Sequence, residues 1–90
     1  MTTCMLFLQL RYVINIRNED YLKAFGENVK RIRTKKGMSR EKLSASSDIE
    51  VMQIYRIETG KVNTTISSVW ALAKGLGVTP AKLMDFKFPI

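Results

Sequence analysis

Two different spacings of hydrophobic residues divide the chain. Near the N-terminus, apolar side chains stand at every second position, which is the period of a β-strand: Leu6, Leu8, Leu10, Tyr12, Ile14 and Ile16. After residue 19, apolar residues recur at steps of three and four positions, as they do on one face of a helix. The sequence therefore predicts an N-terminal extension, residues 1–18, followed by one helical domain, residues 19–90.

The predicted N-terminal strand needs a partner, because a lone strand leaves the backbone groups of both edges unpaired. Nothing later in the sequence clearly offers a second strand. We expect the same strand of a second subunit to pair with it, which would make the extension a dimerisation element. Two alternatives stay open, namely a leader without structure and a strand folded onto its own domain.

Local start and stop signals divide the remaining sequence into five helices. Ser39, Thr65 and Thr79 are residues that cap helix N-termini, and Pro80 suits a first helical position. A glycine follows the first, third and fourth helix, as expected at helix ends. The predicted helices cover residues 20–36, 39–46, 50–58, 66–76 and 81–86. Their apolar faces predict the core: Leu22, Phe25, Val29, Ile32, Leu43, Ile54, Ile57, Ile66, Val69, Leu72, Ala73, Leu76 and Leu83.

The second and third predicted helices form the centre of the domain. They are short and are joined by a tight corner at Asp48, a residue type that tolerates the left-handed backbone a corner requires. This arrangement is typical of a helix-turn-helix, which lays its second helix in the major groove of DNA. At about 100° per residue, Ile54 and Ile57 face inward. The outward face then contains Met52, Gln53, Tyr55 and Arg56.

Charge favours a polyanionic partner. The chain has a formal net charge of +7, from 15 basic and 8 acidic residues. Seven of the basic residues stand between positions 30 and 42, with Glu41 as the single acid there. Such a cluster favours nucleic acid first and an acidic membrane surface second. The alternative interpretation is a solvated helix face.

Several classes of protein are disfavoured by what the sequence lacks. Cys4 is the single cysteine and there is no histidine, so neither an intrachain disulfide nor a Cys/His zinc site can form. We expect no metal, other cofactor or small-molecule ligand. The apolar run at residues 5–10 is too short to span a membrane, and a cytoplasmic protein is expected. No nucleophile–base set is visible, so we do not expect an enzyme. Trp70 is interpreted as a core or interface residue.

Four segments, in order and at matching spacings, carry a resemblance to a known family. They are Phe25-Gly26 with Ile32-Arg33, then GMSREKL at 37–43, IYRIETG at 54–60 and LAKGLGV at 72–78. Over residues 22–86 the chain resembles the Cro/lambda-repressor family of helix-turn-helix proteins, the regulators that include xenobiotic-response-element-like members. The resemblance implies an all-α domain of five helices. It also implies a homodimer that binds a palindromic operator in double-stranded DNA and regulates transcription.

The resemblance also implies which residues act. It places DNA contacts at Arg40, Val51, Met52, Gln53, Arg56 and Lys61, to which the outward face adds Tyr55. It implies a structural ion pair between Arg33 and Glu58. The sequence departs from the family pattern at several positions in the helix-turn-helix. Among them, Arg40 replaces a glutamine, Glu50 replaces a Ser or Thr cap, and Val51 and Met52 are apolar where many relatives carry polar side chains.

Those departures keep a second hypothesis open. A helix-turn-helix fold can serve as a protein-interaction module, such as an antitoxin or an adaptor, and apolar Val51 and Met52 would suit a protein surface. Salt-dependent retention on DNA distinguishes the two hypotheses, because a module that binds only protein releases few counterions from DNA. The sequence does not reveal the operator, the direction of regulation or an effector.

Overall fold

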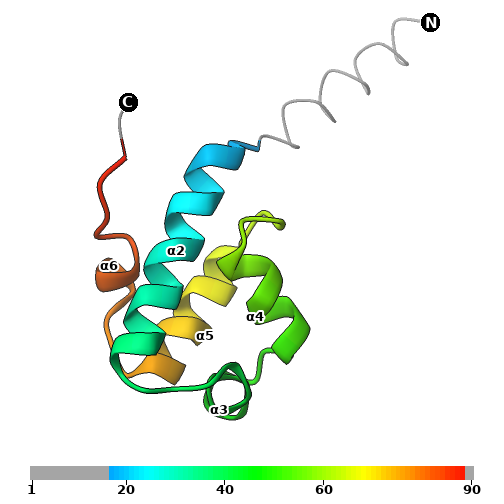
Figure 1. Cartoon of the computed structure of the whole chain (residues 1–90), viewed down its shortest axis with the longest axis vertical. Helices are drawn as coiled ribbons and strands as arrows, with labels where there is room; N and C mark the ends of the chain where they lie inside the picture. Colours follow the sequence, from blue (N-terminus) through cyan, green and yellow to red (C-terminus); the bar gives the residue numbers. More distant parts are fainter. Residues whose placement is uncertain (1–16, 89–90) are drawn as a thin grey trace, which may run out of the picture.

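The structure, a computed structural model, describes residues 17–88 and consists there of five helices (Figure 1). They are α2 (Glu19–Lys35), α3 (Arg40–Ser47), α4 (Val51–Glu58), α5 (Ile66–Leu76) and α6 (Pro80–Leu83). The predicted all-α, five-helix domain is confirmed. The predicted N-terminal strand lies outside the described residues. Within residues 17–88, none of the helices combines the length and apolar character needed to cross a bilayer.

Side-chain caps fix where the helices begin. The hydroxyls of Ser39, Thr65 and Thr79 each accept a hydrogen bond from the backbone N–H three residues later, as predicted. Asn18 caps α2 in the same way through the N–H of Tyr21, a cap that the sequence analysis missed. The first three predicted helices are correct to within one residue at each end, and the fourth matches α5.

The fifth predicted helix, residues 81–86, is wrong at its end, because α6 stops at Leu83. The cause is Asn28, a buried residue of α2. Its side-chain amide donates to the carbonyls of Lys82, at 3.2 Å, and Leu83, at 2.8 Å. A longer helix would use those carbonyls for its own backbone bonds. Asn28 therefore replaces the next turn and joins α6 to α2.

The predicted core residues are buried except Ile66 and Val69, and Val69 is partly buried against the core. Val29, Leu43, Ile54, Ile57, Leu72 and Leu83 are almost completely buried. Ile66, which was predicted to belong to the core, is 86% exposed. It occupies the first turn of α5, where no described helix covers it. The C-terminal segment runs back along α2 (Figure 1), and the Phe86 ring lies 5.3 Å from that of Tyr21.

The crossing of α2 and α4 depends on Gly26. A Cβ atom at this position would lie 2.2 Å from the carbonyl oxygen of Ile57 and 2.6 Å from that of Glu58. Only glycine permits so close an approach of the two helices. The crossing brings the C-terminal end of α4 against the middle of α2, and Arg33 lies further along α2 toward its own C-terminal end.

Candidate nucleic-acid interface

The corner between α3 and α4 sets the direction of the candidate recognition helix. Asp48 adopts the left-handed conformation, with φ of 61°, and its N–H bonds the Ser44 carbonyl. The hydroxyl of Ser47 accepts from the N–H of Ile49 at 3.3 Å. Glu50 occupies the N-cap of α4, but its side chain makes no capping hydrogen bond. The first turn of α4 therefore begins without the side-chain cap that α2, α3, α5 and α6 possess.

The outward face of α4 is arranged largely as its helical angles predict. Ile54 and Ile57 are buried, whereas Met52 and Arg56 are exposed. Tyr55 is 40% exposed. Val51 and Gln53 are only partly exposed. That these residues contact DNA stays a prediction, and the geometry leaves Met52, Tyr55 and Arg56 the most accessible of them.

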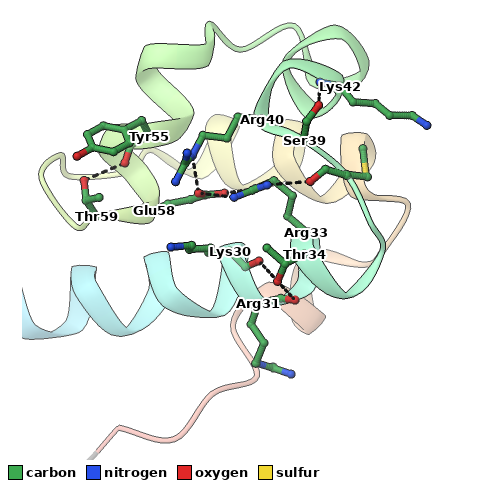
Figure 2. Close-up of polar contacts among 11 residues, drawn as sticks. Lys30, Arg31, Arg33, Thr34, Ser39, Arg40, Lys42, Tyr55, Glu58 and Thr59 are labelled. Carbon is green, nitrogen blue, oxygen red and sulfur yellow. Dashed lines mark hydrogen bonds and ion pairs between the residues drawn. The ribbon is translucent and has the colours of Figure 1, made fainter.

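Arg33 and Glu58 form the ion pair that the family resemblance implies (Figure 2). The Arg33 Nε donates to Glu58 Oε2 at 2.6 Å, and a second guanidinium nitrogen donates to Oε1 at 3.1 Å. A third donates to the carbonyl of Met38 at 2.8 Å. The Glu58 carboxylate has no exposed surface. This bidentate contact therefore joins α2 to the end of α4 and to the segment before α3.

Arg40 also binds Glu58, which the sequence analysis did not predict. Its Nε donates to Glu58 Oε1 at 2.9 Å, and its side chain is 31% exposed. Its guanidinium carbon lies 5.2 Å from the centre of the Tyr55 ring. Arg40 is therefore part of the scaffold as well as a candidate phosphate contact. The signal in the sequence was the replacement of the family's uncharged glutamine by a charged side chain, and it did not show which group Arg40 would bind.

Lys61 completes this group from the loop after α4. Its ammonium nitrogen lies 5.7 Å from the centre of the Tyr55 ring. Its backbone is held at both ends of the residue, since its N–H donates to the Arg56 carbonyl and its carbonyl accepts from Arg17 at 2.8 Å. The candidate contacts Arg40, Tyr55 and Lys61 therefore lie together, although they come from three separate segments.

The basic cluster of residues 30–42 does not form one continuous surface. Arg33 and Arg40 are directed to Glu58. Arg31 donates to the side-chain oxygen of Asn28, and Figure 2 shows it pointing away from Glu58. The lysines at positions 30, 35, 36 and 42 remain exposed. Part of the charge that the sequence analysis assigned to a partner thus serves the fold.

A second feature is an apolar groove on another side of the domain. It has a volume of about 510 Å³ and lies between the first half of α2, the first half of α5 and α6. Trp70 lines it and is 58% exposed, so of the two interpretations of Trp70 the core residue is wrong and the interface residue stays a prediction. The Lys74 ammonium lies 5.3 Å from the centre of the Trp70 ring. We call this surface the α5 face; Tyr21, Ile66, Trp70 and Met84 form its exposed rim.

Comparison with known proteins agrees with this geometry. A family model described as Helix-turn-helix matches residues 29–83. The control protein C.BamHI from Bacillus amyloliquefaciens is 40% identical over 63 residues, which cover 69% of this chain and 78% of that protein.

Two solved structures are similar in fold and sequence. The restriction-modification controller protein C.AhdI from Aeromonas hydrophila has a TM-score of 0.67 at 31% identity, covering 69% of this chain and 94% of that one. The controller protein C.Esp1396I, solved as a tetramer in complex with its natural 35 base-pair operator, has a TM-score of 0.68 at 32% identity. That match covers 72% of this chain and 86% of the other.

Proposed function

The chain belongs to the helix-turn-helix family of DNA-binding transcriptional regulators, and from that premise we propose that it controls the genes of a restriction-modification system. The observation that carries the proposal is the outward face of α4, where Met52, Tyr55 and Arg56 are exposed while Glu58 fixes the end of the helix. The relatives support the class of target, because C.AhdI and C.Esp1396I are restriction-modification controller proteins and C.BamHI is a control protein.

The proposed mechanism involves binding and no catalysis. Exposed lysines and arginines neutralise phosphates and release counterions, which gives affinity for any DNA sequence. Insertion of α4 into the major groove then allows base contacts. Arg56 is suited to guanine and Gln53 to adenine, whereas Met52 can contact only a thymine methyl group. The protein would act in the cytoplasm, without a cofactor, wherever its operator is accessible.

We propose that the active form is a dimer in which the α5 face of one copy packs on the α5 face of a second. The exposed apolar side chains of Ile66 and Trp70 flank a groove that no described residue fills. A two-fold interface uses the same patch on both subunits. C.Esp1396I assembles as a tetramer on its operator, which supports assembly for this chain. Two helix-turn-helix units would then face half-sites about 34 Å apart.

Selection of bound sequences from random DNA tests the proposed function. The wild-type protein should select a palindromic site, and Arg56→Ala should lose preference at one position in each half-site, with affinity reduced by about 1–3 kcal/mol. Lys82→Ala serves as a control, because Lys82 is an exposed cation of α6. If Arg56→Ala selects the same bases as the wild type, Arg56 does not read the operator.

A protein-interaction module remains the second candidate. The observations that favour it are the apolar Val51 and Met52 at positions suited to base reading and the missing side-chain cap at Glu50. Retention on random DNA as salt is raised decides between the two. A regulator should show affinity that falls steeply with salt, and a module specific for protein should show almost no retention.

A further inference from the structure

The Tyr55 ring lies close to two cations, Arg40 and Lys61. This half-exposed ring lies on α4, within 5.2 Å of the Arg40 guanidinium and 5.7 Å of the Lys61 ammonium. Both distances are within the range of a cation–π interaction, in which the electron-rich face of the ring attracts a cation. The two cations approach from different segments, the first turn of α3 and the loop after α4. Tyr55 is therefore the common neighbour of both.

The Tyr55 ring can hold two cations close together without neutralising their positive charge, as a carboxylate would. Arg33 and Arg40 bind the single negative charge of Glu58, and Arg40 and Lys61 lie against the Tyr55 ring, so the group has a net positive charge. Two cations on one ring repel each other. A second carboxylate would offset this repulsion but would also neutralise the charge and repel phosphate. The ring attracts both cations and leaves their charge available to a polyanion.

Arg40 keeps unused hydrogen-bond donors after it has bound Glu58. Arg40 uses only Nε on Glu58, so its two terminal amino groups donate to no other group in the described part of the chain. Arginine presents these terminal groups to phosphate as a planar fork. Glu58 keeps its bidentate partner Arg33 whether or not Arg40 stays in place. Arg40 can therefore bind a phosphate without leaving Glu58 unpaired.

We propose that Tyr55 is a positioning residue for DNA-backbone binding: its ring holds Arg40 and Lys61 at one spacing, so that both cations contact the same stretch of phosphate backbone beside α4. This inference rests on the proposed function. The hydroxyl of Tyr55 is not required, and the ring acts through the cations rather than by stacking on a base. Tyr55 then strengthens binding to every DNA sequence and does not change base preference.

A double-mutant cycle on the full-length protein tests the proposal. Tyr55→Leu should weaken binding to a fixed duplex by about threefold to thirtyfold, the range of a cation–π interaction, and Tyr55→Phe should restore wild-type binding. In a Lys61→Met background the loss from Tyr55→Leu should become much smaller. In a Lys87→Met background, where an exposed cation of the C-terminal segment is removed, the loss should be unchanged.

Three outcomes would overturn the inference. Equal losses in the Lys61→Met and Lys87→Met backgrounds would show that Tyr55 acts without Lys61. Tyr55→Phe binding as weakly as Tyr55→Leu would assign the effect to the hydroxyl. Tyr55→Leu melting well below Tyr55→Phe would assign it to folding.

A measurement on the free protein separates this inference from the proposed function. In the wild type and in Tyr55→Phe, the ring should shift the Lys61 Cε proton resonances upfield, and Tyr55→Leu should abolish the shift. Unshifted Lys61 resonances in the wild type overturn the inference even if the protein binds DNA. If the wild type shows the shift but binds no DNA, the proposed function is overturned. The contact between the Tyr55 ring and Lys61 would then exist independently of DNA binding.

Discussion

At the scale of single residues, Glu58 connects more of the domain than any contact on the outward face. Its buried carboxylate accepts from Arg33 at 2.6 and 3.1 Å and from Arg40 at 2.9 Å. These bonds join α2, α3 and α4 at one point. Removal of one member of a buried ion pair leaves the other charge without compensation, which costs far more than the loss of an exposed pair.

Glu58→Ala should therefore destabilise the protein by about 3–5 kcal/mol, because the buried guanidinium of Arg33 loses its counterion. Chemical or thermal unfolding measures the change. Glu19→Ala is the matched control, since its pair with Arg17 is longer, at 3.6 Å, and exposed, and should cost less than about 1 kcal/mol. Similar stabilities for the two variants would contradict the interpretation of Glu58 as a buried anchor.

Arg40 and Lys61 should behave differently although both are candidate phosphate contacts. Lys61→Ala should reduce the slope of log K against log salt by about one and lower the melting temperature only slightly, because Lys61 makes no ion pair among residues 17–88 and its contact with the Tyr55 ring contributes about 0.5–1 kcal/mol. Arg40→Ala should reduce both, since Glu58 loses one of its two partners. The test is the salt dependence of binding for each variant together with its melting curve. An unchanged slope in both would remove these residues from the interface.

At the scale of elements, the crossing of α2 over α4 permits no side chain at Gly26. Alanine favours helices over glycine by about 1 kcal/mol. That gain is smaller than the cost of the steric clash, because the added Cβ atom would lie 2.2 Å from a backbone carbonyl oxygen of α4. Overpacking typically costs about 1–3 kcal/mol, and a helix carbonyl cannot rotate away to relieve it. The position of α4 relative to α2 is thus fixed by the absence of a side chain.

Gly26→Ala should consequently lower both stability and DNA affinity, since α4 must move to accept the new methyl group. Gly37→Ala is the control, because φ of 70° strains alanine there, but nothing lies within 4 Å of the added Cβ. It should lower stability only. Melting curves measure the stability of each variant. DNA affinity is then measured at a temperature at which both variants are folded. Unchanged affinity in folded Gly26→Ala would show that the crossing does not set the position of α4.

The sequence predicted elements well where their signals are local. Ser39, Thr65 and Thr79 cap helices within three residues of themselves, and the angles around α4 followed from Ile54 and Ile57 alone. The errors come from distant contacts. The end of α6 depends on Asn28, 54 residues before Lys82 in the chain.

The candidate site shows the same limit. The second partner of Glu58, Arg40, depends on a side-chain conformation across 18 residues, which neither periodicity nor family resemblance can supply. Likewise, the exposure of Ile66 depends on which helices cover α5, and the apolar pattern of α5 itself contains no such information.

At the scale of the whole molecule, the α5 face and the outward face of α4 would serve different partners. The proposed second copy would pack on Ile66 and Trp70, and DNA would be bound at Arg56 and at the two cations beside Tyr55. Ile66→Glu should place a charge in the proposed two-fold interface and convert a dimer to a monomer, with operator affinity reduced. Light scattering gives the mass. Ser67→Glu is the control, since Ser67 is an exposed neighbour on α5 that does not line the groove. A dimeric Ile66→Glu protein would require another interface, such as the predicted N-terminal strand.

The position of Trp70 has a practical consequence for spectroscopy. It is the single tryptophan of the sequence and is 58% exposed at the rim of the α5 face. Indole emission moves to shorter wavelengths when water is excluded from the ring, and the adjacent Lys74 ammonium supplies a charge whose displacement also alters it. Intrinsic fluorescence of the unlabelled protein therefore reports on this one surface. A dilution series would give the dissociation constant of assembly, and acrylamide quenching would report whether operator binding covers the ring further.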